Sequence, residues 1–339
     1  MADLKRLLIV KTSSMGDVIH MLPALTDMRR AYPELCIDWL VEEGFADIPA
    51  WHPAVNEVIP VALRRWRGRL MDKTTWQEIS NLKRRLSQAN YDRVLDSQGL
   101  LKSAVLAGWA KRPVMGLDAK SAREFLAAFF YHDKLQVAKG LHAIDRNRQL
   151  AAQALNYSLD EMPLSYGLDS VAHSTDPLAS LDISLPDSYV VFLHAASKQE
   201  KEWSIANWIT LGQAMNQQGL SVLLPWANER EHTNAKTIAV SLSQALVLPK
   251  LGLDALADII VHARLLIGGD SGLSHMAAAF NRPIVALYLS TDPGLTGVCG
   301  ATSKGCSRVE NLRVDGGEQD VSTVLAVLEN NTFLFSSDM

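Results

Sequence analysis

Residues 7–20 read Leu7-Leu8-Ile9-Val10-Lys11-Thr12-Ser13-Ser14-Met15-Gly16-Asp17-Val18-Ile19-His20, a stretch that places a carboxylate in a turn between a strand and a helix. The four apolar residues at its start are typical of a strand covered on both faces. The small polar run then ends the strand, and an amphipathic helix is predicted from about Asp17. Because ligands bind at the carboxyl ends of parallel strands, Gly16 and Asp17 are candidate functional residues. An aspartate here is also a common helix cap, so this turn alone leaves both interpretations open.

The size and composition of the chain are those of an ordinary globular protein. Its 339 residues suffice for two domains, and its 48% hydrophobic and 21% charged residues exclude a disordered chain. The apolar windows are too short for a membrane span, and the N-terminal apolar run is too short for a signal peptide. The three cysteines, Cys36, Cys299 and Cys306, form no CxxC pair and indicate neither a disulfide framework nor a zinc site. We therefore expect a cytoplasmic protein.

The charges divide unevenly between the two halves of the chain. Residues 1–150 hold 23 Lys and Arg against 17 Asp and Glu, a net charge of +6, whereas residues 151–339 hold 10 against 20, a net charge of −10. Much of the positive excess lies in Arg64-Arg65-Trp66-Arg67-Gly68-Arg69. Such a run is either a solvated face or a site for phosphates, with Trp66 as an interfacial anchor. The acidic total charge, without a nucleic-acid motif, argues against nucleic acid as a partner.

Both halves alternate short apolar strands with helical patterns, which predicts an α/β fold with two Rossmann-like, doubly wound parallel sheets. We expect one domain over residues 1–165 and another over 188–339, with a Pro-containing linker at 166–187. The last helix is expected to pack back on the N-terminal domain. Two such domains facing a central cleft would line it with the carboxyl-end turns of both sheets.

The predicted elements follow from this alternation. Strands are expected at 6–11, 36–41, 57–61, 93–96 and 114–117, and then at 189–194, 221–224, 245–248, 265–268 and 284–289. Helices are expected near 17–31, 75–89, 101–110, 121–131 and 142–155, and then near 205–217, 229–242, 253–263 and 271–280.

A turn in the second half, Gly268-Gly269-Asp270-Ser271-Gly272-Leu273-Ser274-His275, repeats the pattern of the first. The N–H groups and the dipole at the start of its Ala-rich helix favour a diphosphate, and Gly272 permits close approach. His275 lies one helical turn after Ser271, so it faces the same anion. A structural, half-buried histidine is the alternative that remains open.

Two further turns at strand ends carry charged groups. After the strand at 189–194, Lys201 is the better candidate to neutralise a diphosphate, and Lys198 is interpreted as a solvated loop residue. After the strand at 221–224, Glu229 or Glu231 is placed either to bind ribose hydroxyls or to serve as a first-turn helix acid.

Several motifs are missing from the sequence. No GxGxxG follows the first strand and no GxxxxGK[ST] occurs, which argues against a classical dehydrogenase and a P-loop enzyme. No Asp-x-Asp and no cluster with metal-ligand spacing is found, so no motif requires a metal or another cofactor.

Four motifs in this order resemble the lipopolysaccharide heptosyltransferases of glycosyltransferase family 9. They are Lys11-Thr12-Ser13-Ser14-Met15-Gly16-Asp17, Asp96-Ser97-Gln98-Gly99-Leu100, Leu224-Pro225-Trp226 and Asp270-Ser271-Gly272-Leu273-Ser274-His275. The resemblance spans nearly the whole chain. It implies a GT-B fold, ADP-heptose as donor, Kdo2-lipid A as acceptor, and transfer with inversion at the anomeric carbon without a metal ion.

The resemblance also implies roles for individual residues. Asp17 resembles the general base of the family. The donor side would be formed by Ala196, Ser197, Lys201, Glu231, Leu251, Asp270, Ser271, Gly272 and His275, and the acceptor side by Ser14, Gly16, Arg64, Arg65, Arg67, Gln98 and Arg123. One departure concerns Ala196 and Ser197, which stand where the family carries two threonines. The lost hydroxyl puts one hydrogen bond to phosphate in doubt.

The resemblance implies a transferase that adds the first heptose of the core, and three alternatives to it stay open. One is a transferase for the second heptose of the core, and another is a GT-B-like nucleotide-sugar epimerase, which would not need the arginine cluster. The third is a bilobed solute-binding protein, which is normally exported and would carry a signal peptide. On the preferred interpretation, the protein would lie peripherally on the cytoplasmic face of the inner membrane, where its lipid acceptor is found.

Overall fold

The computed structural model describes residues 4–171, 173, 178, 183–196, 202–290, 292–301 and 308–330. The chain divides into two compact units, Met1–Val171 (unit 1) and Ala172–Met339 (unit 2). The division falls inside the segment 166–187 that the sequence predicts as a linker, and the domain bounds themselves stay a prediction.

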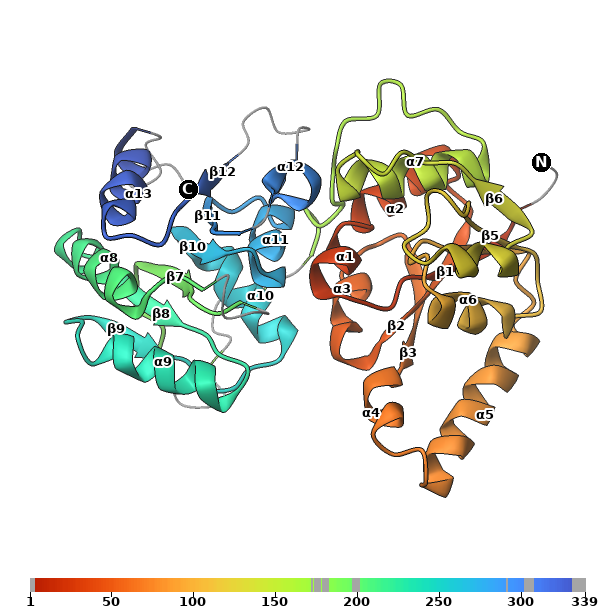
Figure 1. The fold of residues 1–339 in the computed structure, drawn as a ribbon, viewed down its shortest axis with the longest axis horizontal. Helices are drawn as coiled ribbons and strands as arrows, with labels where there is room; N and C mark the ends of the chain where they lie inside the picture. The colour runs from red at the N-terminus through yellow and green to blue at the C-terminus, as the bar shows by residue number, and fades with distance from the viewer. Residues whose placement is uncertain are drawn as a thin grey trace. The chain divides into compact units, whose positions relative to one another are not determined.

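Unit 1 is built on a parallel sheet of six strands in the order β3-β2-β1-β4-β5-β6 (Figure 1). The strands are β1 (Arg6–Val10), β2 (Cys36–Glu42), β3 (Val55–Val61), β4 (Arg93–Asp96), β5 (Val114–Leu117) and β6 (Asp133–Leu135). The chain leaves β1 toward one edge and returns through β4 toward the other. The point where the strand order reverses therefore lies between β1 and β4, where Val10 pairs with Asp96.

The helices of unit 1 cover both faces of this sheet, as four buried residues in succession along β1 require. They are α1 (Met15–Ile19), α2 (Leu22–Ala31), α3 (Asp47–Ala50), α4 (Leu63–Arg67), α5 (Lys73–Gln88), α6 (Leu101–Gly108) and α7 (Ala143–Leu155), with 3₁₀ turns η1 (Glu43–Phe45) and η2 (Phe125–Phe130). Alternate residues of β1, Leu8 and Val10, share one buried cluster with Leu86 of α5 and Ala104 of α6. Figure 1 shows α4 and α5 in orange, projecting from the sheet of unit 1.

The predicted helix at 17–31 is wrong as one element, because the structure has two helices there. Ser14 is the N-cap of α1, so the helix starts before Asp17, which occupies its first turn. Pro23 stands in the first turn of α2, where a residue without an N–H group costs no intrahelical bond. A helix continuing from α1 would have needed that N–H, so α1 ends at Ile19, with His20 as its C-cap, and a new helix begins at Leu22.

The predicted helix at 121–131 is also wrong, since only the 3₁₀ turn η2 forms within it. The N–H of Ser121 donates to the Asp118 carboxylate at 2.8 Å, and the Ser121 hydroxyl accepts from the N–H of Val137 at 3.0 Å. These bonds tie the start of the segment to a turn instead of a helical ladder. The sequence analysis also missed β6, α3 and α4 of unit 1 and three elements of unit 2, at Val309–Arg313, Pro293–Thr296 and Gln319–Asn330. All of these except the last have five residues or fewer.

Unit 2 repeats the topology of unit 1 with the strand order β12-β11-β10-β7-β8-β9. The strands are β7 (Tyr189–Leu193), β8 (Ser221–Leu224), β9 (Ala245–Val247), β10 (Leu265–Gly269), β11 (Ile284–Tyr288) and β12 (Val309–Arg313). Gly268 pairs with Leu193 across the two central strands, and a Cβ added to Gly268 would lie 2.4 Å from the Leu193 Cβ. Glycine is therefore required where β7 and β10 meet.

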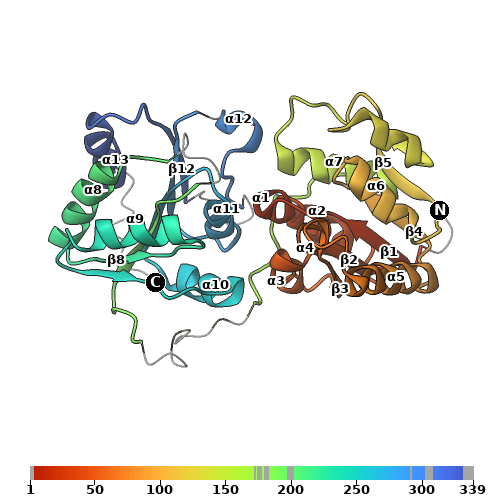
Figure 2. The same ribbon diagram turned by 60° about the horizontal axis from the view of Figure 1, so that its bottom comes forward.

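The helices of unit 2 are α8 (Ile205–Gln217), α9 (Glu229–Ala239), α10 (Leu253–His262), α11 (Gly272–Ala279), α12 (Pro293–Thr296) and α13 (Gln319–Asn330). In Figure 2, α13 lies beside α8, and Val324 and Leu328 of α13 join the buried cluster around Trp208 of α8. The expected packing of the last helix on the N-terminal domain stays a prediction. Within the part of the chain that the structure describes, no helix has the length and apolar composition to cross a bilayer.

Candidate active site

The carboxylate of Asp17 lies in the turn after β1, at the point where the strand order of unit 1 reverses. Its Oδ2 accepts hydrogen bonds from the backbone N–H of Ser14 at 3.0 Å and from the Ser14 hydroxyl at 3.1 Å, which is the helix-capping role. The Arg123 guanidinium donates to the same oxygen at 3.4 Å. Among the described residues, no group donates to Oδ1. Asp17 is thus a capping residue, and all the donors that reach its carboxylate from the described residues bind the same oxygen, Oδ2.

The charges around Asp17 keep it ionised. Burial alone would raise the pKa of Asp17, but the positive charges of Lys11 and Arg123 and the two hydrogen bonds from Ser14 outweigh it, so the pKa is lowered. Lys11 is itself buried, and its ammonium donates to the backbone oxygen of Ser97 at 3.0 Å. Two cations thus act on Asp17 in addition to its position in the first turn of a helix.

A buried network holds the backbone that leads to Asp17. The side-chain oxygen of Gln98 accepts from the N–H groups of Thr12 at 2.8 Å and Ser13 at 3.2 Å, and its amide nitrogen donates back to the Ser13 oxygen. The Gln98 N–H in turn donates to the carboxylate of Asp96 at 2.9 Å. Gln98 therefore holds the turn that leads to Asp17 through its amide, and its predicted contact with an acceptor stays a prediction.

The Asp96 carboxylate anchors that network from the end of β4. Its Oδ2 accepts from the hydroxyl of Ser103 at 2.8 Å and from that of Tyr131 at 2.7 Å. Burial raises the pKa of Asp96, and its four hydrogen bonds act in the opposite direction. Because all four donors converge on one carboxylate, the ends of β4, α6 and η2 are fixed relative to one another.

Three arginines of the cluster, Arg64, Arg65 and Arg67, lie on α4, and Arg69 follows the end of this helix. Arg65 is held by two carboxylates, with Glu43 at 3.1 Å and Glu78 at 3.0 Å. Arg64 lies 5.1 Å from the ring centre of Phe45 and, like Arg67, it is exposed. These two keep their charge available to an anion, whereas the charge of Arg65 is balanced within the protein.

The interpretation of Trp66 as an interfacial anchor is wrong. Its side chain is 6% exposed within the core of unit 1, and its indole N–H donates to Glu78 at 2.6 Å. Trp66 is the buried residue of the short helix α4, and its neighbours Arg65 and Arg67 lie on other sides of that helix. The run of arginines around a tryptophan therefore reflects a helix that packs one side against α5.

In unit 2, the start of α11 follows β10 as predicted. The Ser271 hydroxyl caps the helix by accepting from the N–H of Ser274 at 3.4 Å, and the Ser274 hydroxyl donates to the oxygen of Gly269 at 2.7 Å. His275 is buried on α11, with its Nε2 4.0 Å from Oδ1 of Asp270. The helix begins at Gly272, so the N–H groups of Gly272 and Leu273 have no intrahelical acceptor. The structure brings Asp270, Ser271, Gly272 and His275 together.

The predicted ribose acid Glu231 lies in the first turn of α9. Its carboxylate accepts from the N–H of Ala227 at 2.7 Å and from the side-chain amide of Asn228 at 2.6 Å. The interpretation of Glu231 as a first-turn helix acid is thereby confirmed. A carboxylate oxygen can accept from more than one donor, so binding of ribose hydroxyls by Glu231 stays a prediction. Leu251 lies half-buried between β9 and α10.

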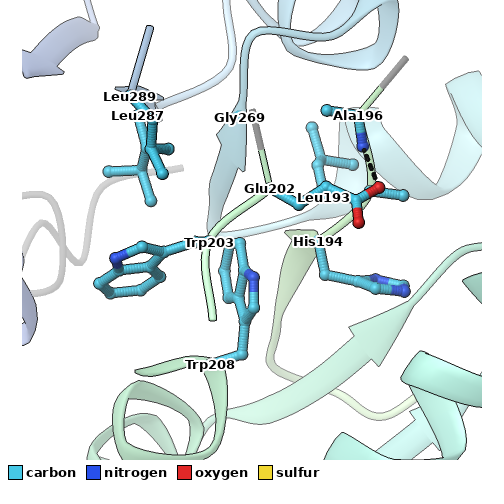
Figure 3. Close-up of a pocket in the computed structure, with 10 residues that line it drawn as sticks. Leu193, His194, Ala196, Glu202, Trp203, Trp208, Gly269, Leu287 and Leu289 are labelled. Carbon is cyan, nitrogen blue, oxygen red and sulfur yellow. Dashed lines mark hydrogen bonds between the residues drawn. The ribbon is translucent and has the colours of Figure 1, made fainter. Parts of the chain in front are cut away.

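A hollow in unit 2 lies at the carboxyl ends of β7, β10 and β11, lined in part by Ala196, Glu202, Trp203 and Gly269 (Figure 3). The Glu202 carboxylate accepts from the Ala196 N–H at 3.2 Å and from both terminal nitrogens of Arg230, at 2.5 and 2.7 Å. Ser197 and Lys201, which the sequence predicts on the donor side, lie outside the described residues.

Sequence reasoning missed three groups of residues at these two sites. The first is Lys11, to which the motif alone assigns no role, although a lysine at the end of a buried strand is itself a signal. The Glu202–Arg230 pair joins residues 28 apart and has no sequence signature. The third is Arg146, whose Nη2 donates to the backbone oxygen of Ser121 at 2.7 Å. Its positive charge acts to lower the pKa of Lys11, and the sequence gives no sign that these two residues are close.

Known proteins similar to this chain share both units. The model of glycosyltransferase family 9 (heptosyltransferase) matches residues 79–321. Lipopolysaccharide heptosyltransferase 1 of Pseudomonas aeruginosa is 49% identical over 301 residues, which are 87% of this chain and 81% of the relative. The solved structure of the Escherichia coli heptosyltransferase WaaC with ADP is 38% identical, covers 96% of this chain and 99% of its own, and superimposes with a TM-score of 0.85. The same enzyme with ADP-2-deoxy-2-fluoro heptose superimposes with a TM-score of 0.83 at the same identity and coverage.

Proposed function

Since this chain belongs to glycosyltransferase family 9, the heptosyltransferases, we propose that it transfers L-glycero-D-manno-heptose from ADP-heptose to a Kdo sugar of Kdo2-lipid A. The donor is supported by the similar enzyme whose structures contain ADP and a fluorinated ADP-heptose. The acceptor is supported by the relative that is named a lipopolysaccharide heptosyltransferase 1 and by the positive charge of residues 1–150. We place the reaction at the cytoplasmic face of the inner membrane, where such an acceptor is presented.

The observation that carries this proposal is the Asp17 carboxylate with its available Oδ1. In the proposed step, Asp17 takes the proton of an acceptor hydroxyl, and the oxygen of that hydroxyl forms a bond to the anomeric carbon of the heptose. The bond from this carbon to the diphosphate oxygen breaks, and its electron pair leaves with ADP. Attack on the face opposite to ADP inverts the configuration.

The lowered pKa of Asp17 suits a late proton transfer. A carboxylate of low pKa is a weak base toward a neutral hydroxyl, so little proton transfer occurs early in the reaction. The attacking oxygen becomes acidic once it bonds to the oxocarbenium-like carbon, and Asp17 then accepts the proton. Asp17 stays ionised between turnovers because Lys11 and Arg123 stabilise its negative charge.

The leaving diphosphate would be bound in unit 2 without a metal ion. The start of α11 offers N–H groups and the positive end of the helix dipole, and Ser271, Gly272 and His275 surround it. Lys201 would supply the neutralising charge, Asp270 would bind heptose hydroxyls, and Glu231 would bind the ribose. Among the described residues, no group of three or more His, Cys, Asp or Glu side chains is arranged to hold a metal.

The test is to incubate the protein with ADP-heptose and Kdo2-lipid A in the presence of EDTA and to measure the mass of the lipid. We expect a gain of one heptose. A strict need for magnesium would overturn the metal-free mechanism, and no gain under any condition would overturn the function.

The acceptor is tested in the same way against Kdo2-lipid A that already carries one heptose. A gain only on this second acceptor would show a transferase for the second heptose. Epimerised nucleotide sugar without any lipid product would instead support the epimerase alternative.

A further inference from the structure

We propose that one face of unit 1 docks on an anionic lipid bilayer and inserts apolar side chains into it. This apolar face consists of Leu70, Met71 and Trp76 from the α4–α5 turn and helix α5, Leu101 and Val105 of α6, and Phe125, Leu126, Phe129 and Phe130 of η2. This proposal rests on the proposed function, because it takes a lipid as the partner of the apolar face.

The turn η2 exposes its large residues and buries its small ones. Ala127 and Ala128 lie in the core of unit 1, whereas Phe125 is 60% and Phe129 71% exposed. A 3₁₀ turn that served only to cover the sheet would place its large apolar residues inward. Four large apolar residues turned outward within six positions mark a surface that another apolar phase covers.

Helix α6 connects η2 to the rest of the apolar face. The carboxylate of Glu124, directly before η2, accepts from the N–H of Leu101 at 2.6 Å, and α6 packs on η2 through Ala104 and Ala107. Leu101 and Val105 lie one helical turn apart on the neighbouring, exposed side of α6. They therefore stand between η2 and the groove on the far side of the helix.

That groove has a volume of about 730 Å³ and separates α6 from α4 and α5. Leu70 and Trp76 line it together with Leu101 and Val105, and Trp76 is 57% exposed. Met71, next to Leu70 at the tip of the projecting pair, is 96% exposed. Ser13 also lines the groove, next to the Ser14 that donates to the Asp17 carboxylate, so the groove extends to the turn that carries Asp17.

The charges around the apolar face match phosphate-bearing headgroups. Arg64, Arg67 and Lys102 line the groove, and Arg123 lies two residues before η2. Residues 63–76 hold five Lys and Arg against one Asp. Each basic residue near an anionic membrane surface strengthens attachment, and tryptophan prefers the boundary between headgroups and chains. A bilayer satisfies both the apolar residues and the cations, whereas a second copy of the face would place like charges opposite each other.

The test measures binding of the full chain to sedimented vesicles of phosphatidylethanolamine with phosphatidylglycerol. The test variant is the double substitution Phe125→Ser and Phe129→Ser, and the matched control is Val240→Ser, an 84% exposed apolar residue of unit 2. We expect the partition coefficient of the double variant to fall by about tenfold or more, since an inserted Phe contributes at least that factor. The control should bind as the parent does, and vesicles of phosphatidylcholine alone should bind the parent more weakly.

Two further measurements make the outcome decisive. The thermal midpoints of parent and double variant should agree, because both substituted side chains are exposed. Transfer of heptose to a deacylated, water-soluble acceptor should also stay unchanged. Undiminished vesicle binding by the double variant would overturn the proposal, as would a parent that binds no vesicles. A concentration-dependent dimer that only the parent forms would show that a second copy covers the face instead.

Failure of the docking face and failure of the proposed function are distinguishable. Vesicle binding requires neither donor nor acceptor sugar, and heptose transfer to the deacylated acceptor requires no membrane. A protein that binds vesicles but transfers no heptose would support the docking face and overturn the proposed function. A protein that transfers heptose to the deacylated acceptor but binds no vesicles would support the function and overturn the docking face.

Discussion

The two units have the same strand order, yet they carry different residues in the same topological position. The last residue of the first strand pairs with Asp96 in unit 1 and with Gly268 in unit 2. In unit 1 this position holds a buried carboxylate that fixes the turn before Asp17 through Gln98. In unit 2 it holds a glycine that lets the central strands approach. The same topology thus places a buried carboxylate that fixes a turn in unit 1 and a glycine that lets two strands approach closely in unit 2.

The difference teaches how a doubled fold divides a transfer reaction. Unit 1 surrounds Asp17 with the cations Lys11 and Arg123, which suits a base that must stay ionised beside an acidic acceptor. In unit 2 the carboxylates Glu202 and Glu231 are bound by neighbouring donors, which leaves the helix starts to meet an anion. The five predictions below separate these roles.

The largest effect is expected from Asp17→Asn, which removes the proposed base of unit 1. We expect kcat to fall by about 10²- to 10⁴-fold, the usual value of a general base, with the Kd for ADP unchanged because the proposed nucleotide site lies in unit 2. Steady-state kinetics and calorimetry measure the two quantities. Asp72→Asn, at the N-cap of α5, is the control for losing a carboxylate at a helix start. Near-parental kcat in Asp17→Asn would leave Asp17 as a cap only.

The next prediction concerns Asp96→Asn, which removes one acceptor oxygen from the brace of unit 1. In the parent, one Asp96 oxygen accepts from the Ser103 and Tyr131 hydroxyls, and the other accepts from the N–H groups of Gln98 and Gly99. The NH₂ group of the substituted asparagine replaces one of these oxygens, so one pair of donors loses its acceptor. We expect this loss to lower the free energy of unfolding by about 3 kcal/mol. Urea unfolding measures this loss. We also expect kcat to fall more than the acceptor KM rises, since the catalytic turn loses its position. Equal stability of variant and parent would contradict the proposed brace.

In unit 2, Gly268→Ala is expected to destabilise the sheet by about 1–3 kcal/mol. The new Cβ would lie 2.4 Å from that of Leu193, so the two central strands must move apart. Thermal unfolding measures the loss, and Gly108→Ala in α6, where an added Cβ meets no atom within 4 Å, is the control. An unchanged midpoint for Gly268→Ala would show that the sheet adjusts without cost.

A smaller effect is expected from the arginines of α4, which split into two kinds. Substituting Arg64 and Arg67 by Ala should raise the acceptor KM by about fivefold for each residue and reduce its dependence on salt. Arg65→Ala should change acceptor KM less, because Glu43 and Glu78 already balance that charge. Kinetics at several salt concentrations measure both. The same rise in KM for all three arginines would contradict this division.

The smallest effect is expected from Lys11→Met, a test of the field at Asp17. Asp17 has a lowered pKa in the folded protein, so it stays ionised, and kcat is retained, as the pH falls through the ordinary carboxylate range. Without the Lys11 charge the pKa of Asp17 rises, and the acidic limb of the pH profile of kcat should move to higher pH. Lys83→Met, on the exposed side of α5, is the control. An unmoved limb would mean that Arg123 and Ser14 alone set the pKa.

Much of the fold could be predicted from local pattern. The strands that lie in the middle of the sheets are short apolar runs followed by small polar residues, and this pattern depends only on neighbouring residues. β6 was missed because an edge strand of three residues, two of them charged, has no such pattern. Pro23 is visible in the sequence, yet the break before α2 was overlooked because the apolar periodicity continues across it.

The candidate site was predictable in its motifs and much less so in its contacts. Asp17, Gln98 and the turn at 270–275 were identified because family motifs mark them. The burial of Trp66 was not, since it depends on Glu78 of another helix accepting the indole N–H. The orientation of Phe125 and Phe129 was likewise hidden, because a helix that spanned 121–131 would have placed these side chains differently.

The sequence by itself determined the strand-turn-helix units, the uneven charge and the residues at the strand ends, because each depends on the order of residues along the chain. The tertiary structure alone decided that Lys11 and Arg123 lie beside Asp17, that Arg65 is neutralised while Arg64 is not, and that η2 turns its phenylalanines outward. These contacts join residues far apart in the chain. They depend on which strands become neighbours in the sheet, and that order is set by the packing of the whole unit.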